Sequence, residues 1–230
     1  MPFGWLTFVA EPLYLALRLL YAHCVHNWGW AIILLTAIFN ALMIWPRIIS
    51  MKSSLKMMRL TPKVDVIKKR AAHLKINDPE RIALHNEIAA LYKSEGASIY
   101  SGCLPMLLQV PLLFAYQRVL HNATELHHAH WLWLTDLSLP DPLHILPVFI
   151  IGTMCLTQFI TPSPGVDPTQ RRMLAILMPL FMGFTLAHYA SGLALYWVTG
   201  NLFNLVLQLC INRSKIGIEM CGIAAIKAAP

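Results

Sequence analysis

Charged residues are scarce in this sequence, and their scarcity excludes most classes of soluble protein. Only 13% of the 230 residues are charged, whereas 57% are hydrophobic, and the mean hydropathy is +0.56. A soluble globule of this size needs more polar residues than that to cover its surface. The composition therefore predicts an integral membrane protein.

Several motifs of other protein classes are also missing. The five cysteines share no close spacing, so neither a disulfide framework nor a metal knuckle is indicated. Five histidines between His121 and His144 have no spacing that fixes a metal site, and the sequence contains no glycine-rich phosphate loop. His188 and Ser191 lie close in sequence, but a working serine needs a base on a separate element, so we interpret Ser191-Gly192 as a turn. We expect no enzymatic activity, no metal and no cofactor.

Positive charge is concentrated in one part of the chain. The net charge is +7, and 11 of the 18 lysines and arginines lie between Arg47 and Lys93. Clustered cations in a loop beside a membrane span indicate the cytoplasmic side. With five membrane spans, an outer N-terminus and a cytoplasmic C-terminus, 16 of the 18 cations fall on that side.

Apolar runs of spanning length set the expected organisation of the chain. We expect an all-α integral membrane protein with five transmembrane helices, an N-terminal interfacial helix and a cytoplasmic helical hairpin. The expected spans are residues 28–46, 104–120, 143–160, 173–190 and 193–211. The corresponding segments are an interfacial amphipathic helix (1–27), the first transmembrane helix with its cytoplasmic extension (28–60), the hairpin (61–102), four further transmembrane helices with their loops (103–213) and a cytoplasmic tail (214–230).

The N-terminal segment has apolar residues at helical spacing, interrupted by Thr7, Glu11 and Arg18. That pattern is typical of a helix lying in the membrane interface. A spanning helix is the alternative, and Glu11-Pro12 in its middle argues against it.

Two helices are expected in the basic segment that follows the first span. The first should run to about Leu74, with an interruption at residues 61–62, where Thr61 precedes Pro62. The second should open at Asp78-Pro79, a capping residue followed by a first-turn proline, and end at Gly96. Its cations could contact RNA or anionic lipid, or simply form a solvated helix face. The candidate contact residues are Lys63, Lys68, Lys69 and Arg70.

Polar residues lie inside the apolar spans. Thr36 and Asn40 share one helix face at spacing i, i+4, and Arg47 follows seven residues later on the same face of a continuous helix. Asn201 and Asn204 begin a similar face in the last span. If these faces converge they line a wet cavity, whereas the alternative is a set of dry hydrogen bonds between helices.

Several sequence blocks together resemble the YidC/Oxa/Alb family of membrane protein insertases. They occur in the order and at the spacing of the family over about residues 3–213. The blocks are NWGW at 27–30, SMKSSLKMMRLTPKV at 50–64, GCLPMLLQVPLLFAYQRVL at 102–120, DLSLPDPLHILP at 136–147, DPTQRRML at 167–174 and SGLALYWVTGNLFNLVLQ at 191–208.

This resemblance implies an insertase and chaperone of the bacterial cytoplasmic (inner) membrane. Its five-span core would enclose a hydrophilic groove, closed on the outside, that passes polar segments of nascent membrane proteins and releases the apolar helix into lipid. Besides these clients and the lipid bilayer, the ribosome and a Sec-type translocon are candidate partners, and no specific nucleic acid is expected. Residues expected in the groove are Thr36, Asn40, Arg47, Gln109, Tyr196, Trp197 and Asn201.

One position departs from the family pattern. Members of this family typically carry an arginine in the groove, and the matching residue here is Asn40. Arg47, on the same predicted face, is our candidate for the missing charge. One alternative is a small membrane transporter or channel, which internal repeats would favour, and the sequence shows none. The other is a structural subunit, which would leave the basic hairpin unexplained.

Overall fold

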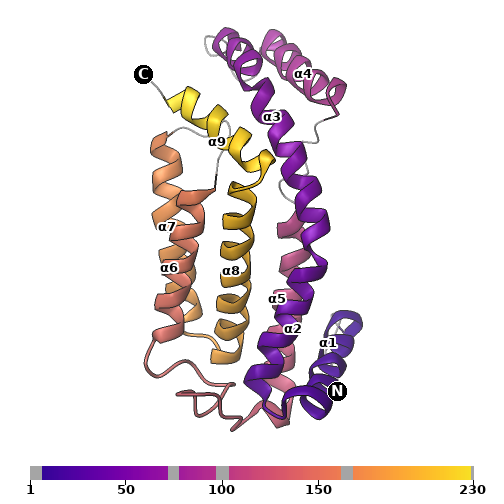
Figure 1. Ribbon diagram of the computed structural model, residues 1–230, viewed down its shortest axis with the longest axis vertical. Coiled ribbons are helices and arrows are strands. Elements are labelled where there is room, and N and C mark those ends of the chain that lie inside the picture. Colours follow the sequence, from indigo (N-terminus) through magenta and orange to yellow (C-terminus); the bar gives the residue numbers. More distant parts are fainter. Residues whose placement is uncertain (1–6, 72–77, 97–103, 162–167, 229–230) are drawn as a thin grey trace. The chain divides into compact units, whose positions relative to one another are not determined.

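The computed structural model describes residues 7–71, 78–96, 104–161 and 168–228, and these ranges are almost entirely helical (Figure 1). No strand occurs within them, which confirms the all-helical expectation. The helices are α1 (Thr7–Leu20), α2 (Trp28–Leu42), α3 (Ile44–Ala71), α4 (Pro79–Ser94), α5 (Leu104–Asn122), α6 (Ile145–Ile160), α7 (Pro168–Leu186), α8 (Ser191–Asn212) and α9 (Lys215–Ala228), with a short π-helix η2 (Tyr21–Val25) and a short 3-10 helix η4 (Thr124–Leu126).

The chain divides into two compact units that differ sharply in charge. Unit 1 comprises Met1–Ile44, Met106–Thr161 and Pro168–Leu209, and unit 2 comprises Trp45–Pro105, Pro162–Asp167 and Cys210–Pro230. Unit 1 has four cations and four acids, whereas unit 2 has fourteen cations and seven acids. The whole net positive charge of the chain therefore belongs to unit 2.

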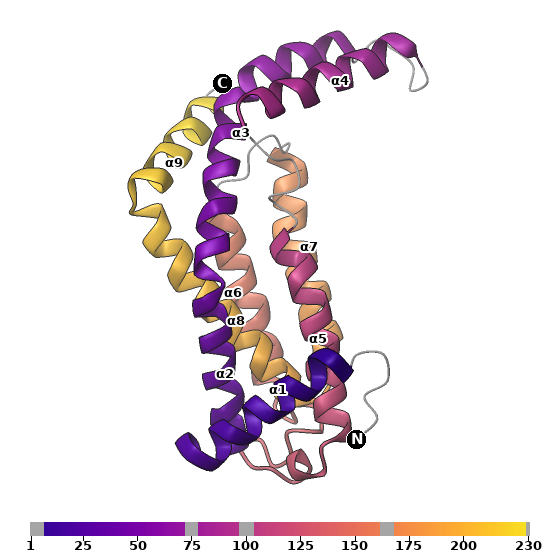
Figure 2. The same cartoon turned by 90° about the vertical axis from the view of Figure 1, so that its right-hand side faces the viewer.

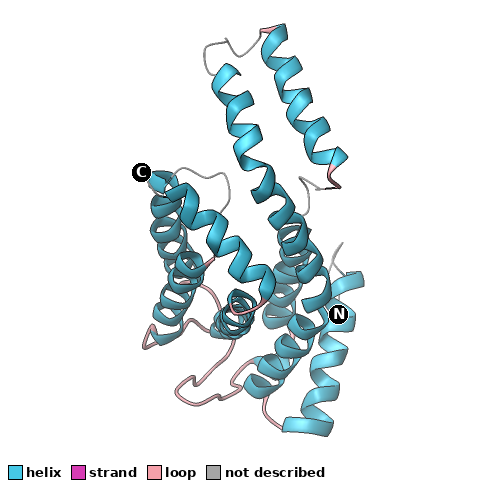
Figure 3. Ribbon diagram, turned by 45° about the horizontal axis from the view of Figure 1, so that its top comes forward, coloured by secondary structure: helices cyan, strands magenta, loops and turns pink. Residues whose placement is uncertain are grey.

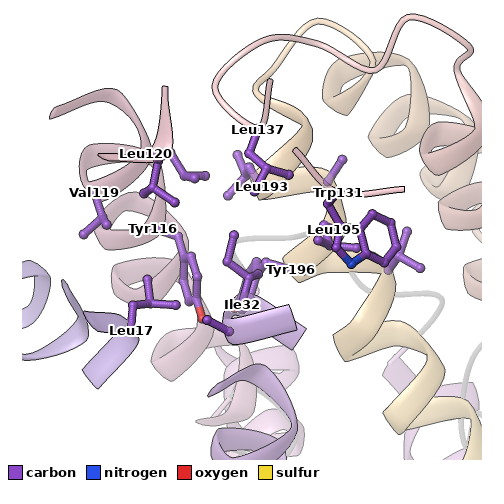
Figure 4. Close-up of a cluster of buried hydrophobic side chains, with 14 of the residues drawn as sticks. Leu17, Ile32, Tyr116, Val119, Leu120, Trp131, Leu137, Leu193, Leu195 and Tyr196 are labelled. Atoms are coloured by element: carbon purple, nitrogen blue, oxygen red, sulfur yellow. The ribbon is translucent and has the colours of Figure 1, made fainter. Parts of the chain in front are cut away.

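The core of unit 1 is built from α1, α2, α5, α8 and the loop after α5. Buried side chains from all of them form one apolar cluster, which includes Leu17, Ile32, Leu120, Leu137 and Leu193 (Figure 4). Helix α1 packs against α2 (Figure 2), and α6 and α7 form a hairpin of neighbouring helices (Figure 1). The last pair approaches closely, because a Cβ on Gly183 would lie 2.3 Å from the Ile151 side chain. Small residues at such contacts are typical of helix packing in membranes.

The five expected spans coincide with helices of unit 1, with shifted ends. Helix α2 ends at Leu42 rather than at residue 46, and the chain breaks at Met43 before α3 begins. Helix α7 begins at Pro168, before the start of the span expected at residue 173, since proline suits a first helical turn. Within the described ranges, Thr7–Val25 and Ser191–Asn212 are long and apolar enough to cross a membrane, and the broken pair of α2 and α3 adds a third candidate when it is counted as one span.

Helix α1 and η2 follow each other without a break and cover the segment expected to be interfacial. Ala10 and Leu17 are buried, whereas Phe8 and Leu19 on the other side are exposed apolar residues. The Tyr14 hydroxyl donates to Glu125 Oε1 at 2.6 Å, which ties α1 to the segment after α5. The length of this helix keeps the spanning alternative open.

Helix α3 of unit 2 runs through Pro62, so the interruption expected at residues 61–62 is wrong. The Thr61 hydroxyl donates to the Met57 carbonyl at 3.2 Å inside this continuous helix. Leu55, Met58 and Val64 on either side of the proline are buried, and this packing outweighs the helix-breaking tendency of one proline. The boundary expected between residues 60 and 61 therefore falls within a helix.

Helix α4 begins and ends where the sequence predicts. The Asp78 side chain accepts from Glu80 N at 3.0 Å, Pro79 occupies the first turn, and Gly96 follows the helix with a φ of 62°. Figure 3 draws α4 beside the C-terminal part of α3, and the cytoplasmic hairpin stays a prediction. The Lys56 ammonium donates to the Glu95 carbonyl at 3.2 Å and so joins the end of α4 to α3.

The C-terminal segment, expected to be a tail, contains helix α9. Its Met220 is buried against Leu55 and Met58 of α3, and Arg59 donates to Glu219 Oε1 at 2.7 Å. The sequence signal that we missed is Ser214, whose hydroxyl accepts from Gly217 N at 3.3 Å as a helix cap.

Candidate functional site

Polar side chains on three helices of unit 1 make up the candidate site. They are Thr36 and Asn40 on α2, Tyr116 on α5, and Trp197 and Asn201 on α8, and we call these five residues the polar seam. The helices approach one another here, since Thr36 contacts Tyr116 and Asn40 lies beside Gly200 of α8. Tyr116 was not among the expected site residues. Tyr116 stands seven residues after Gln109, so the two positions share one face of α5. That spacing could have identified Tyr116 from the sequence.

The Thr36 end of the seam is dry. Thr36 is 1% exposed, its hydroxyl donates to the Ile32 carbonyl at 2.7 Å, and it lies 3.4 Å from the Tyr116 hydroxyl. The Tyr116 ring stacks on Tyr196 with centroids 4.2 Å apart, and both rings belong to the apolar cluster (Figure 4). Thr36 and Tyr196, both expected in the groove, therefore pack between helices in this structure.

The seam becomes more open one helical turn further along α2. Asn40 is half-buried, and its Nδ2 donates to the Thr36 carbonyl at 2.8 Å. A Cβ on Gly200 would lie 3.8 Å from Asn40 Nδ2, which is ordinary contact distance. Helix α8 therefore passes close to Asn40 at Gly200, with room left for a methyl group.

Two nitrogen atoms on α8 are buried without a hydrogen-bond partner among the described residues. They are Nε1 of the half-buried Trp197 and Nδ2 of the half-buried Asn201, which is one turn away. An unpaired buried donor costs about 1–3 kcal/mol, and buried polar groups are ordinarily paired. These two donors are the feature of the seam that demands a functional explanation.

The other expected site residues either lie outside the described residues or belong to unit 2. The side chains of Gln109 on α5 and Lys68 on α3 lie outside the described residues. Arg47 belongs to α3 in unit 2, beyond the helix break at Met43, so the single continuous face expected to link it to Asn40 does not exist. Lys63, Lys69 and Arg70 are exposed on α3.

The loop between α5 and α6 holds the start of α2. The Asn27 side chain caps this helix by accepting from Gly29 N at 3.0 Å, and its Nδ2 donates to the His130 carbonyl at 2.9 Å. The Trp131 ring lies directly on Gly29, where an added Cβ would be 2.2 Å from the ring. Glycine is therefore required at this contact.

The same loop holds the starts of α6 and α8. Ser191 N donates to the Leu139 carbonyl at 2.7 Å and Gly192 N to the Leu137 carbonyl at 2.9 Å. These two residues begin α8, so the turn expected at Ser191-Gly192 is wrong by a few residues, and the chain turns just before them, at residues 187–190. Asp141 Oδ2 accepts from Leu146 N at 2.8 Å and caps α6. The loop thereby joins the N-terminal ends of three helices of unit 1.

Asp136 is the charged centre of this loop. Ser138 donates to its Oδ1 through both N and Oγ, at 2.8 and 2.5 Å, and His128 Nδ1 lies 3.5 Å from its Oδ2. Burial by itself would raise the pKa of the Asp136 carboxyl, but the hydrogen bonds from Ser138 and from the His128 backbone outweigh it and lower the pKa below its usual value. The loop is therefore built around an ionised carboxylate.

Comparisons with known proteins agree with this all-helical membrane architecture. The family model described as "60Kd inner membrane protein" matches residues 20–217. The membrane protein insertase YidC of Wolinella succinogenes is 41% identical over 213 residues, covering 92% of this chain and 38% of the relative, and that of Campylobacter jejuni is 41% identical over 212 residues, covering 92% and 39%. A crystal structure of an active YidC insertase superposes with a TM-score of 0.60 at 25% identity over 88% of this chain and 46% of its own.

The chain belongs to the 60Kd inner membrane protein family, since the family model and these relatives cover nearly all of it. It spans about two fifths of the length of the curated relatives it matches. The family and its bacterial members place the protein in the bacterial inner membrane.

Proposed function

We propose that this chain forms the core of a membrane protein insertase. A hydrophilic groove in unit 1 passes the polar segments of nascent membrane proteins and releases the following apolar helix into lipid. Asn40, Trp197 and Asn201 line this groove, and Gln109 joins them because it shares a helix face with Tyr116. Thr36 and Tyr196 form its packed wall.

The observation that carries the proposal is the pair of unpartnered donors at the half-buried end of the polar seam. Trp197 Nε1 and Asn201 Nδ2 are buried, yet no described residue accepts from them. Buried polar groups are ordinarily paired, as those of Thr36 and Asn40 are by donating to carbonyls of their own helix α2. A client segment that arrives and leaves supplies the acceptors only during insertion.

The work done by such a groove is solvation. A charge at the centre of a bilayer costs about 2.5–3.5 kcal/mol on insertion scales, so a path with polar partners over part of the bilayer removes much of that barrier. Burial of the apolar segment in lipid then favours release by about 25 cal/mol per Å². No nucleotide, cofactor or covalent step is needed.

The distribution of charge supports a multi-pass topology with unit 2 on the cytoplasmic side. All of the net positive charge belongs to unit 2, and the positive side of a bacterial membrane protein faces the cytoplasm. The N-terminus then lies outside, with five spans formed by α2, α5, α6, α7 and α8. In this proposal the cations of the hairpin meet the ribosome, a Sec-type translocon or an arriving client. The candidates are Lys63, Lys68, Lys69 and Arg70.

A crosslinking experiment tests the insertase function. Photoreactive residues are placed at Asn40 and Trp197 in the full chain, with Phe184, an exposed residue of α7, as the lipid-facing control. Exposure to a stalled nascent membrane protein should give adducts at the first two positions and fewer at the control. Silence at both seam positions would contradict the proposal and favour a transporter, a channel or a structural subunit.

A further inference from the structure

The two unpartnered donors have a defined spacing along α8. Trp197 and Asn201 stand at i, i+4, so they lie on one face and about 6 Å apart along the helix axis. The indole nitrogen of Trp197 can only donate, and Asn201 presents its Nδ2 donor as the buried, unpaired atom. Their ligand must therefore offer two acceptors at a similar spacing.

No charged side chain takes part in the polar seam. The eight charged residues of unit 1 are Glu11, Arg18, Arg118, Glu125, Asp136, Asp141, Arg171 and Arg172, and none belongs to it. The Asn40 amide is already engaged with the Thr36 carbonyl. Neutral donors bind any acceptor of suitable geometry, so this site has no built-in preference for acidic side chains.

An extended polypeptide meets the spacing of the two donors. Carbonyl groups on one edge of an extended chain recur every second residue, roughly 6.6 Å apart, whereas the carbonyls of a helix are occupied by its own hydrogen bonds. We propose that Trp197 and Asn201 bind alternate backbone carbonyls of an extended client segment, whatever its side chains. This inference rests on the proposed insertase function and assigns to it the chemical group that is recognised.

Paired substitutions in the full chain, reconstituted in phospholipid vesicles, test the inference. Asn201→Leu removes one donor with little change in side-chain volume, and Trp197→Phe removes the other together with part of the indole ring. Trp30→Phe, at an exposed position on α2, is the matched control for the same substitution. The clients are single-span proteins that carry a neutral polar tail, an acidic tail, a neutral tail with backbone esters in place of alternate amides, or no tail. Insertion is measured as protease protection.

The donor variants should slow insertion of neutral and acidic tails by the same factor, on the order of threefold to tenfold for each donor. The tailless client and the Trp30→Phe variant should be unaffected. An ester carbonyl is a weaker acceptor than an amide carbonyl, so the ester tail should insert slowly in the unsubstituted protein and change little in the variants. The melting temperature should stay unchanged or rise, since an unpaired buried donor has been removed.

The possible failures are distinct. If the unsubstituted protein inserts no client above the level of empty vesicles, the proposed function fails and this inference falls with it. If that protein inserts its clients and the donor variants match it, the inference alone is overturned. If only the acidic tails insert more slowly, the site recognises carboxylates instead. If the tailless client loses as much insertion and the melting temperature falls, the two side chains have a structural role. Both outcomes overturn the inference.

Discussion

The contact between Gly29 and Trp131 gives the sharpest stability prediction. A Cβ on Gly29 would lie 2.2, 2.3 and 2.6 Å from three atoms of Trp131, much closer than real side chains approach. Trp131 is 8% exposed and packs edge-on against Trp30 and at a tilt against Trp133, so it has little room to move away. Gly29→Ala should therefore force a local rearrangement of the loop that joins the starts of α2, α6 and α8.

Two opposing effects decide the magnitude of the change. Replacing glycine with alanine in a helix interior ordinarily stabilises by about 0.8–1 kcal/mol, and the gain is smaller in the first turn, where Gly29 lies. Overpacking of a buried contact ordinarily costs about 1–3 kcal/mol. The overlap with a rigid ring places Gly29→Ala at the upper part of that range, so the net result is a loss of about 1–2 kcal/mol.

Gly152 of α6 provides the matched control, because a Cβ there would meet nothing within 4 Å. Gly152→Ala should raise the melting temperature of the detergent-solubilised protein, and Gly29→Ala should lower it. Trp131→Leu would make room for the added methyl group, so the penalty of Gly29→Ala should shrink in that background. Equal stabilisation by both alanine substitutions would refute the reasoning.

Four further predictions concern the loop, the hairpin and the seam. Because the folded-state pKa of Asp136 is lowered, its contribution to stability is present above about pH 4 and is lost as the pH falls through the folded pKa. Asp136→Asn should therefore reduce the loss of stability at acid pH, and an unchanged loss would contradict this. Hydrogen exchange should be faster in residues 78–96, most of whose side chains are exposed, than in the helices of unit 1, and uniform protection would be evidence against a separately mobile hairpin. In a background without native cysteines, a cysteine at Asn40 should react with an impermeant thiol reagent added from the cytoplasmic side, whereas one at the buried Thr36 should not. No reaction at Asn40 would contradict the proposed groove. Arg47→Ala should slow the insertion of clients with acidic and neutral tails equally, because Arg47 lies beyond the helix break, and Asn40→Arg should not rescue it. Slower insertion of acidic clients alone would identify Arg47 as the missing groove charge.

Features set by neighbouring residues could be predicted from the sequence. Asp78, Pro79 and Gly96 fix the ends of α4 through contacts within a few residues, and all three behave as expected. The break expected at Pro62 failed because its neighbours are buried by contacts that a local signal does not contain. Helix α9 was missed for a related reason, since its Met220 packs against α3 more than 150 residues earlier in the chain.

The polar seam, too, could be predicted from the sequence only in part. Helical spacing placed Thr36 and Asn40 on one face, and the structure agrees. Spacing could not reveal that Thr36 is sealed against Tyr116, because that contact joins residues 80 positions apart. Which residues of a polar face stay dry depends on the helix that packs against them, and a single sequence does not specify that partner.

The contrast between the two ends of the seam is itself an argument about function. Hydrogen bonds between membrane helices average about 0.6 kcal/mol, whereas an unpaired buried donor costs about 1–3 kcal/mol. Trp197 and Asn201 together thus cost several times what the paired Thr36 contact contributes, although apolar side chains would carry no such penalty. A stability requirement alone would favour those apolar residues. A requirement to bind the polar backbone of a passing chain favours the donors, because their unpaired state in the free protein is what leaves them available to a client.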